Sequence, residues 1–499
     1  MKRYFLLLLG AFALAACTAT PDNPILTIEG GQIQGVRLDD APGVTVFRGI
    51  PYAAPPIGEN RWRAPQSVVP WEGVRICDKF GHPPFQAAHY PGGYTTEWGY
   101  GDEAPYSEDC LYLNVWTKAP GQTERKLPVA VWIFGGGLRE GWSSEPEFDG
   151  KAWAGKDVVL VSFNYRVGPF GFFAHPALSA EDPEHATGNW GTLDQIEVLK
   201  WVQRNIAQFG GDPDNVMLFG QSAGARSVKF LSASPLTKGL YNKAVIMSGS
   251  GLMDPRKPAQ PMFPGGPVLP AQTQATLAEA EQSIKAVADW AGLTDLTKLR
   301  AASTETVFAM NNLYTSATGK RSVLSASPIS PYIDGYVMPE TFDEACIDGT
   351  LADIPYMIGY TLNDAGNMAE QIIDFCLNRE EKGGMAWAYQ FARPLPTDGR
   401  ENVPQGAFHS CDLWYVFKSM EHCWRPWTPG DWDLSERMLT AWTNFAKYAD
   451  PNGPDGCEWE PYTAEQPEFM VWKLDEADAE ASTVGQPLQA PRPSFGARP

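Results

Sequence analysis

The stretch Val216-Met217-Leu218-Phe219-Gly220-Gln221-Ser222-Ala223-Gly224 holds the strongest signal in this chain. Its first four residues are an apolar run typical of a buried strand, and the residues that follow can form a helix. A serine between small residues at such a turn is a nucleophile elbow, because the tight turn lifts the hydroxyl clear of the sheet. Ser222 is therefore the candidate nucleophile. The alternative is a glycine-rich turn with an incidental serine.

Strand and helix patterns alternate along the rest of the chain. A hairpin is expected over residues 25–38, and apolar residues at helical spacing predict a helix over 192–209 with Thr192 and Gln195 as its capping box. Further strands are predicted at 129–134, 158–163, 244–247, 356–361 and, last, 469–474, and a late helix at 434–448. This alternation predicts the α/β-hydrolase class of α/β fold, with a large, mostly parallel central sheet flanked by helices.

Two insertions interrupt the alternation and are predicted to form the walls of a cleft. Residues 78–106 are rich in Gly, Pro, Tyr and His, and residues 251–272 are rich in Pro and Gly and precede a helix over 273–291. Such insertions lie over the carboxyl ends of the strands, where ligands bind. A single domain is expected over 25–475, and the acidic, then proline-rich tail 476–499 is expected to be disordered.

The first residues resemble a targeting segment rather than part of the fold. Lys2 and Arg3 precede a short apolar stretch, and Leu14-Ala15-Ala16-Cys17 resembles a bacterial lipobox. We therefore expect a lipoprotein-type signal peptide over 1–16, lipidation of Cys17, a tether over 17–24, and export to the periplasmic or outer-membrane face of a bacterial membrane. The alternative is an ordinary secretory signal with a chance cysteine.

Composition narrows the classes of partner. The chain has 499 residues with 59 acidic against 39 basic side chains and a net charge of −20, which argues against nucleic acid and against charge-driven binding to anionic lipid. No run of 18 apolar residues occurs, so the membrane is expected to be reached only through the lipid anchor. The eight cysteines show no C-x-x-C spacing and H-E-x-x-H is absent, so no metal is expected. Nothing in the sequence sets an oligomeric state.

A nucleophilic serine needs a base and a third group that orients the base. In this fold class the nucleophile, the acid and the histidine follow one another along the chain, and only His409 and His422 lie far enough downstream. We predict His409 as the base. Asp364, which directly follows a predicted strand, is expected to accept its Nδ1 proton. The alternative acids are Asp334 and Asp343.

An oxyanion formed during attack needs backbone N–H donors. Phe134-Gly135-Gly136-Gly137 ends a predicted strand, and glycines there let the backbone approach a substrate carbonyl without hindrance from Cβ atoms. Gly136, Gly137 and Ala223 are the expected donors. Loss of one such donor costs on the order of 10²–10³ in rate.

These segments resemble the type B carboxylesterases, a family whose relatives include the cholinesterases. The resemblance spans about residues 25–475 and rests on five segments: 209–224 around the serine, 108–115 with the sequence EDCLYLNV, 164–168, 132–137, and 406–417 around the histidine. It implies an α/β-hydrolase that cleaves small-molecule carboxylic esters with a Ser-acid-His triad and without a cofactor. It also implies a disulfide between Cys77 and Cys110.

Three positions depart from the family's pattern. Gln221 stands where glutamate is usual, which removes a negative charge beside the nucleophile. Asn363-Asp364-Ala365 stands in place of Asp-Glu-Gly, and because aspartate is shorter its strand end must lie closer to His409. Phe134 stands where His or Tyr is commoner. None of the three removes a required chemical group.

The sequence thus predicts a serine carboxylesterase that works through an acyl-enzyme. One alternative is a non-catalytic cholinesterase-like binding or adhesion protein on the same scaffold, and another is a triad hydrolase of amides, carbamates or lactones. The 18 tryptophans suggest a cleft that takes aryl or bulky acyl groups, although core packing explains the same count.

Overall fold

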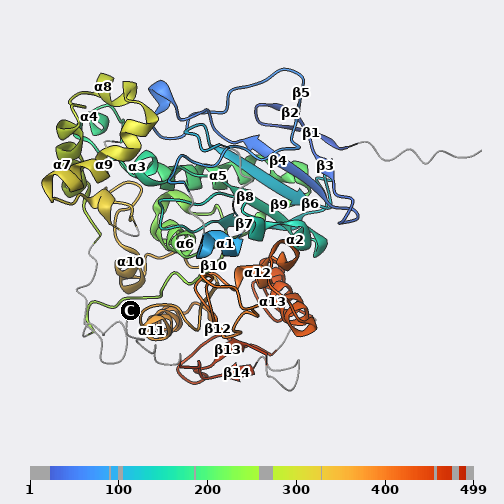
Figure 1. Ribbon diagram of the computed structural model, residues 1–499. Coiled ribbons are helices and arrows are strands. Elements are labelled where there is room, and N and C mark those ends of the chain that lie inside the picture. The colour runs from blue at the N-terminus through green and yellow to red at the C-terminus, as the bar shows by residue number, and fades with distance from the viewer. Residues whose placement is uncertain are drawn as a thin grey trace, which may run out of the picture.

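The computed structural model describes residues 23–88, 92–98, 100, 105–184, 187–257, 274–326, 329–454, 458–474 and 483–489, and the structural statements below refer to these residues. They form an eleven-stranded sheet of order β14-β13-β12-β11-β10-β9-β7-β8-β6-β4-β3 and a smaller sheet of order β1-β2-β5 (Figure 1). The strands are β1 (Ile25–Ile28), β2 (Gly31–Gln34), β3 (Val36–Arg37), β4 (Thr45–Pro51), β5 (Val74–Ile76), β6 (Tyr112–Thr117), β7 (Leu127–Ile133), β8 (Val159–Phe163), β9 (Gly211–Gln221), β10 (Lys243–Met247), β11 (Tyr356–Thr361), β12 (Ala386–Phe391), β13 (Phe469–Trp472) and β14 (Thr483–Gly485).

Helices connect and cover the strands. The α-helices are α1 (Tyr94–Trp98), α2 (Lys151–Gly155), α3 (Gly168–Gly171), α4 (Pro176–Ser179), α5 (Trp190–Asn205), α6 (Ala223–Ala233), α7 (Leu277–Trp290), α8 (Leu296–Ala301), α9 (Thr304–Thr318), α10 (Phe342–Asp348), α11 (Met368–Glu381), α12 (Leu413–Val416) and α13 (Pro429–Tyr448). Short 3-10 turns are η1 (Gly58–Asn60), η2 (Pro146–Phe148), η3 (Ile206–Phe209), η4 (Pro235–Thr237), η5 (Val323–Ser325) and η6 (Met420–His422). None of these helices is long and apolar enough to span a bilayer.

The centre of the large sheet is parallel, as the sequence predicts. Strands β8, β7, β9, β10, β11, β12 and β13 pair in parallel in that order, whereas β6, β4, β3 and β14 add antiparallel edges. Because β7, β9 and β11 run in one direction, their carboxyl ends meet at one edge. The glycine loop, Ser222 and Asp364 follow these three strands and are therefore brought to that edge.

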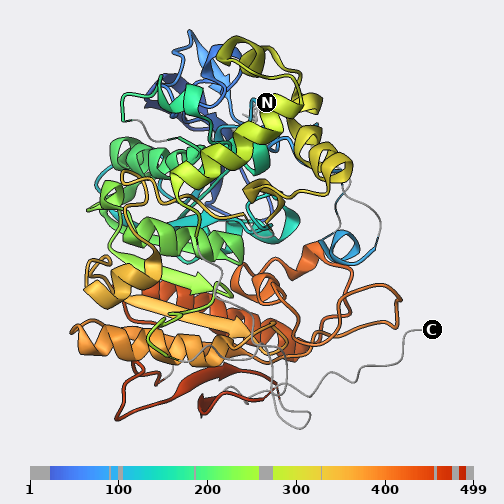
Figure 2. The same ribbon diagram turned by 90° about the vertical axis from the view of Figure 1, so that its left-hand side faces the viewer.

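Helices cover both faces of the sheet. In Figure 1, α2 and α13 lie on one side, and α6, α10 and α11 lie on the other, which faces the viewer in Figure 2. Helices α7, α8 and α9 form a separate group at the end of the molecule opposite β13 and β14 (Figures 1 and 2). The α/β-hydrolase architecture expected from the sequence is confirmed.

Much of the aromatic content belongs to the core. Nine tryptophans are less than 2 % exposed, and Trp132 on β7 shows how they pack. Its ring centroid lies 4.8 Å from that of Phe219 on β9 and 5.0 Å from those of Phe148 and Phe417. Close ring packing of this kind adds to the free energy of burial, so the tryptophan count is not evidence for an aromatic cleft.

Two local predictions are wrong. Helix α5 begins at Trp190, so Thr192 and Gln195 lie inside it and form no capping box, and the Gln195 amide instead donates to Ser227 Oγ at 3.0 Å. Among the described residues the last strand is β14, which follows the predicted strand β13 and lies in the tail that the sequence predicts to be disordered. It pairs antiparallel with β13, and the Gln390 side chain bonds the backbone of Leu488, because these contacts satisfy polar groups at the sheet edge.

Candidate active site

Ser222 stands at the sharp junction between β9 and α6. Its backbone has φ 56° and ψ −120°, a conformation that residues other than glycine seldom adopt. The Ser222 N–H donates to the carbonyl of Met247 on the neighbouring strand at 2.8 Å, which helps hold the turn. Such strain persists only where the surrounding structure enforces it, and it is common at functional sites.

The two glycines of the elbow are required by close approach of the backbone. A Cβ atom on Gly224 would lie 2.0 Å from the carbonyl oxygen of Ile133, and one on Gly220 would lie 2.5 Å from the carbonyl carbon of Gly224. Strand β7, the elbow and the first turn of α6 are therefore packed backbone to backbone. This packing places Ser222 beside the glycine loop that follows β7.

His409 and Asp364 are brought together by the fold. Nδ1 of His409 is hydrogen-bonded to Oδ1 of Asp364, and the Asp364 side chain is 1 % exposed. The other carboxylate oxygen accepts the backbone N–H of Thr361 at 3.0 Å, which fixes the carboxylate at the end of β11. Burial lowers the pKa of His409, but the hydrogen bond and charge of Asp364, aided by Asp412, outweigh it and raise that pKa above its ordinary value.

Gln221 contacts the other nitrogen of the same ring. Its Nε2 lies 3.2 Å from Nε2 of His409. Since Nδ1 carries the proton that is donated to Asp364, Nε2 is the free lone pair and accepts from the amide of Gln221. The ring is therefore oriented with its basic nitrogen toward the β9 end that carries Ser222.

Asp412 is a buried acid near this pair that sequence reasoning missed. It is 0 % exposed, and its Oδ2 lies 3.5 Å from the hydroxyl of Tyr389. Burial and the charge of Asp364 raise the pKa of Asp412 to about 7. Its position three residues after His409 was the only signal in the sequence, and that signal carries no information about burial.

The glycine loop has the backbone shape that an oxyanion site needs. Gly136 and Gly137 have φ values of 93° and 66°, which glycine alone adopts readily. A Cβ on Gly136 would lie 2.2 Å from the carbonyl oxygen of Glu140. The Gly137 carbonyl accepts the N–H of Ile329 at 3.0 Å, which ties the loop to a distant segment. The third expected donor, Ala223, is the first residue of α6 and is 2 % exposed.

The candidate site opens into a cleft of about 410 Å³. Ser222, Gln221 and His409 line it together with Gly135, Gly136 and Gly137. The remaining lining comes from three places: Tyr94, Thr95, Trp98 and Tyr100; Arg139 to Gly141, Glu145, Glu147 and Phe148; and Ser410 and Leu413. The insertion at 78–106 thus supplies a wall, as predicted. Residues 251–257 do not line the cleft, and 258–272 fall outside the described residues.

Two neighbouring acids, Glu145 and Glu147, line part of the cleft. The Tyr100 hydroxyl and the Trp142 N–H donate to Glu145, the latter at 2.8 Å. Burial raises the pKa of Glu145 to about 7, and burial together with the charge of Glu145 raises that of Glu147. The pair therefore holds a proton at pH values where exposed glutamates are ionised.

The alternative acids are engaged elsewhere. Oδ1 of Asp334 accepts the N–H of Met338 at 2.9 Å, and its Oδ2 accepts the Asn189 amide at 2.8 Å. Asp343 accepts the N–H of Met253 at 3.1 Å. Of the candidate acids, only Asp364 is bonded to the predicted base.

The disulfide implied between Cys77 and Cys110 is wrong for this structure, because both are free thiols. The Cys77 N–H donates to the carbonyl of Gln34 at 2.8 Å beside the small sheet, whereas Cys110 is buried near the Arg166–Asp194 ion pair. Burial raises the pKa of the Cys77 thiol to about 12, so it is protonated and unreactive at neutral pH. The predicted lipidation site, Cys17, lies outside the described residues.

One trio of side chains in the described part of the chain has spacing suited to a metal ion: Asp149, Glu421 and His422. The Lys151 ammonium lies 2.8 Å from Glu421 and 3.7 Å from Asp149. The trio therefore already has a cation, and it lies outside the cleft lining.

Known proteins resemble this chain in sequence and in fold. A model of the carboxylesterase family matches residues 22–380 and 368–492. The fumonisin B1 esterase of Sphingopyxis macrogoltabida is 38% identical over 359 residues, 70% of this chain but only 58% of its own length. The medium-chain fatty acyl-CoA hydrolase precursor of Anas platyrhynchos is 31% identical over 530 residues, 92% of this chain and 90% of its own. A solved PNB esterase superposes with a TM-score of 0.72 at 28% identity, covering 93% of this chain and 97% of that one.

Proposed function

The chain belongs to the carboxylesterase family, and we propose that it hydrolyses small-molecule carboxylic esters through an acyl-enzyme formed on Ser222. His409 acts as general base, Asp364 orients it, and the N–H groups of Gly136, Gly137 and Ala223 bind the oxyanion. The observation that carries the proposal is the ring of His409, which is bonded to Asp364 through Nδ1 and presents Nε2 toward the strained elbow.

Each group has one task in the reaction. The Ser222 hydroxyl attacks the ester carbonyl as Nε2 of His409 takes its proton, and the buried carboxylate of Asp364 stabilises the resulting imidazolium. The tetrahedral oxyanion is met by backbone N–H groups that need no reorganisation. His409 then protonates the departing alcohol, and a water molecule, activated by the same nitrogen, releases the acid.

The two alternatives make different predictions. A non-catalytic binding protein would neither turn over esters nor react with a serine-directed probe, whereas a hydrolase of amides, carbamates or lactones would react with the probe but prefer another substrate. The intact His409–Asp364 pair supports catalysis rather than binding alone. Substrate profiling separates the remaining chemistries.

The test uses purified protein with 4-nitrophenyl acetate and a fluorophosphonate probe. We expect the wild type to turn over and to be labelled, and Ser222→Ala to lose both. Ser250→Ala is the matched control, because Ser250 also has a positive φ of 58° but does not line the cleft. A wild type that neither reacts nor labels would overturn the proposal. The panel should include fumonisin B1 and medium-chain acyl-CoA, which the relatives' names give as their substrates.

We also propose that the chain is exported and acylated at Cys17. The lipobox-like Leu14-Ala15-Ala16-Cys17 supports this proposal, because acyl chains on a cysteine bind a bilayer without a spanning helix. Mass spectrometry of the N-terminal peptide, compared between the wild type and Cys17→Ser, tests it. An unmodified wild-type cysteine would refute it.

A further inference from the structure

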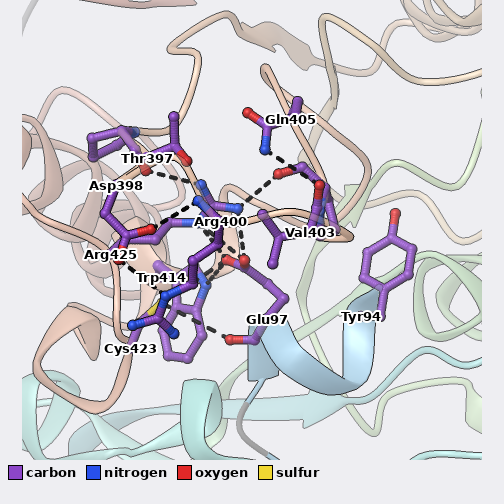
Figure 3. Close-up of polar contacts among 12 residues, drawn as sticks. Tyr94, Glu97, Thr397, Asp398, Arg400, Val403, Gln405, Trp414, Cys423 and Arg425 are labelled. Carbon is purple, nitrogen blue, oxygen red and sulfur yellow. Dashed lines mark hydrogen bonds and ion pairs between the residues drawn. The ribbon is translucent and has the colours of Figure 1, made fainter. Parts of the chain in front are cut away.

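A buried ion pair joins a wall of the cleft to the C-terminal half of the chain. Glu97 belongs to α1, and its carboxylate and the Arg425 guanidinium are both 0 % exposed. Nε of Arg425 lies 2.8 Å and 3.0 Å from the two Glu97 oxygens, and Nη2 lies 2.7 Å from Oε2. The Trp414 indole N–H also donates to Glu97 at 3.1 Å (Figure 3). This two-pronged geometry fixes distance and orientation together.

Arg425 also holds the segment that leads to the base. Its Nη1 donates to the carbonyl of Pro396 at 2.9 Å and its Nη2 to that of Pro404 at 2.8 Å, so it ties two points of the loop that precedes His409. Its guanidinium lies 5.3 Å from the ring centroid of Phe408, the neighbour of His409. One side chain therefore contacts both the cleft wall and the approach to the base.

Helix α1 completes the connection on the side of the cleft. Its residues Tyr94, Thr95 and Trp98 line the cleft, and the Tyr94 hydroxyl donates to the backbone carbonyl of His409 at 3.2 Å. The ring of Trp98 lies 5.3 Å from that of Trp414. A helix of five residues has little stability of its own. Its position therefore depends on contacts such as Glu97–Arg425.

We propose that Arg425 is a positioning residue that holds α1 and the His409 segment as one unit, and so sets both the aim of the base and the wall that meets the alcohol part of the ester. The departing alcohol receives its proton from His409, so the alcohol part of the ester lies on the side of the cleft formed by α1 and the His409 segment. The inference rests on the proposed role of His409 as general base. It goes beyond that role because Arg425 does not line the cleft and acts only through its neighbours.

The test compares Arg425→Lys with the wild type. Lysine keeps the positive charge opposite Glu97. It cannot make the two-pronged contact with the Glu97 carboxylate and also donate to the carbonyls of Pro396 and Pro404. We expect kcat for 4-nitrophenyl acetate to fall by about 10- to 100-fold, the effect of a misplaced catalytic group. We expect the acidic limb of the pH–rate profile to move to lower pH, because a loosened ring is stabilised less by Asp364. KM for esters of bulky alcohols should rise more than KM for methyl esters.

Arg61→Lys is the matched control. Arg61 is also buried, pairs with both oxygens of Glu108 and donates to the backbone carbonyl of Arg300 at 3.1 Å, but it contacts neither α1 nor the His409 segment. We expect Arg61→Lys to lower Tm about as much as Arg425→Lys does. We expect it to leave the acidic limb of the pH–rate profile unchanged. A second test variant, Glu97→Gln, keeps the shape of the side chain. It should raise KM for esters of bulky alcohols more than it lowers kcat.

The outcomes separate the two proposals. If the wild type is inactive and unlabelled, the proposed function fails. If the wild type is active but Arg425→Lys and Arg61→Lys lower activity equally, with the acidic limb unmoved in both, Arg425 has only a structural role and this inference is overturned.

Discussion

Nε2 of His409 lies 3.2 Å from the amide nitrogen of Gln221, while Nδ1 of the same ring is bonded to Asp364. In the proposed mechanism this Nε2 lone pair takes the proton of Ser222, and in the structure an amide donor occupies it. For catalysis the serine hydroxyl must replace that amide. The residue next to the nucleophile is thus a direct determinant of the basicity and availability of His409.

Gln221→Glu is expected to move the acidic limb of kcat/KM to higher pH. A carboxylate at this distance stabilises the imidazolium and raises further a pKa that is already above its ordinary value, by about 1 unit or more. Because the base works only when neutral, activity is then lost at a higher pH as the solution is acidified. The pH dependence of 4-nitrophenyl acetate hydrolysis measures the shift.

Gln221→Met is the neutral control for that substitution. It removes the amide donor, which stabilises the neutral ring, without adding charge, so a smaller upward shift of the limb than in Gln221→Glu is expected. A shift as large as that of Gln221→Glu would show that loss of the amide donor, rather than the added charge, governs the pKa of His409.

Asp364→Asn is expected to lower kcat on the order of 10⁴-fold, because the amide no longer holds the productive tautomer of the ring. The acidic limb of the residual activity should move to lower pH, since the hydrogen bond and charge that raise the pKa of His409 are lost. Asp343→Asn, at an alternative acid bonded to Met253, should keep near wild-type kcat. Measurement of kcat for both variants shows which carboxylate orients His409.

Gly224→Ala is expected to destabilise the elbow by about 1–3 kcal/mol, because its Cβ would lie 2.0 Å from the carbonyl oxygen of Ile133. The displaced turn should also lower kcat by on the order of 100-fold. Gly155→Ala is the control, because a Cβ at that exposed position meets no atom within 4 Å. Its stability should stay within about 0.5 kcal/mol of the wild type in a denaturant titration.

Glu147→Gln is expected to raise Tm more at about pH 8 than at about pH 5. Burial and Glu145 raise the pKa of Glu147 above its ordinary 4.5, so the folded state holds a proton that the unfolded state has released. Stability therefore falls as pH rises above 4.5 toward the raised value, and the neutral amide removes that loss. Equal gains for Glu147→Gln at both pH values would contradict the burial argument.

The parts of the site that could be predicted are those that chain connectivity controls. Ser222 follows an apolar strand, and Gly220 and Gly224 stand two residues before and after it. Asp364 also follows its strand directly, and parallel pairing brings these strand ends to one edge. The elbow and the strand that leads to Asp364 are each encoded within a few consecutive residues, so a single sequence reveals them.

The errors arose where distant contacts compete with local patterns. Gln195 has the spacing of a capping residue, but it bonds Ser227 inside the core. Residues 483–489 are polar and poor in aromatic residues, yet the free edge of β13 and the side chain of Gln390 pair with them. Cys77 and Cys110 match a pattern of the family but remain separate thiols in different surroundings.

By itself the sequence determined the class of sheet, and it predicted Ser222 as nucleophile with His409 and Asp364 to serve it, because strand patterns and the elbow motif lie within short segments. Only the tertiary structure decided that Gln221 occupies the basic nitrogen, that Asp412, Glu145 and Glu147 are buried, and that Arg425 joins α1 to the segment of the base. These features depend on residues up to 328 positions apart in the chain. Burial and orientation over such separations follow from packing, which no local pattern records.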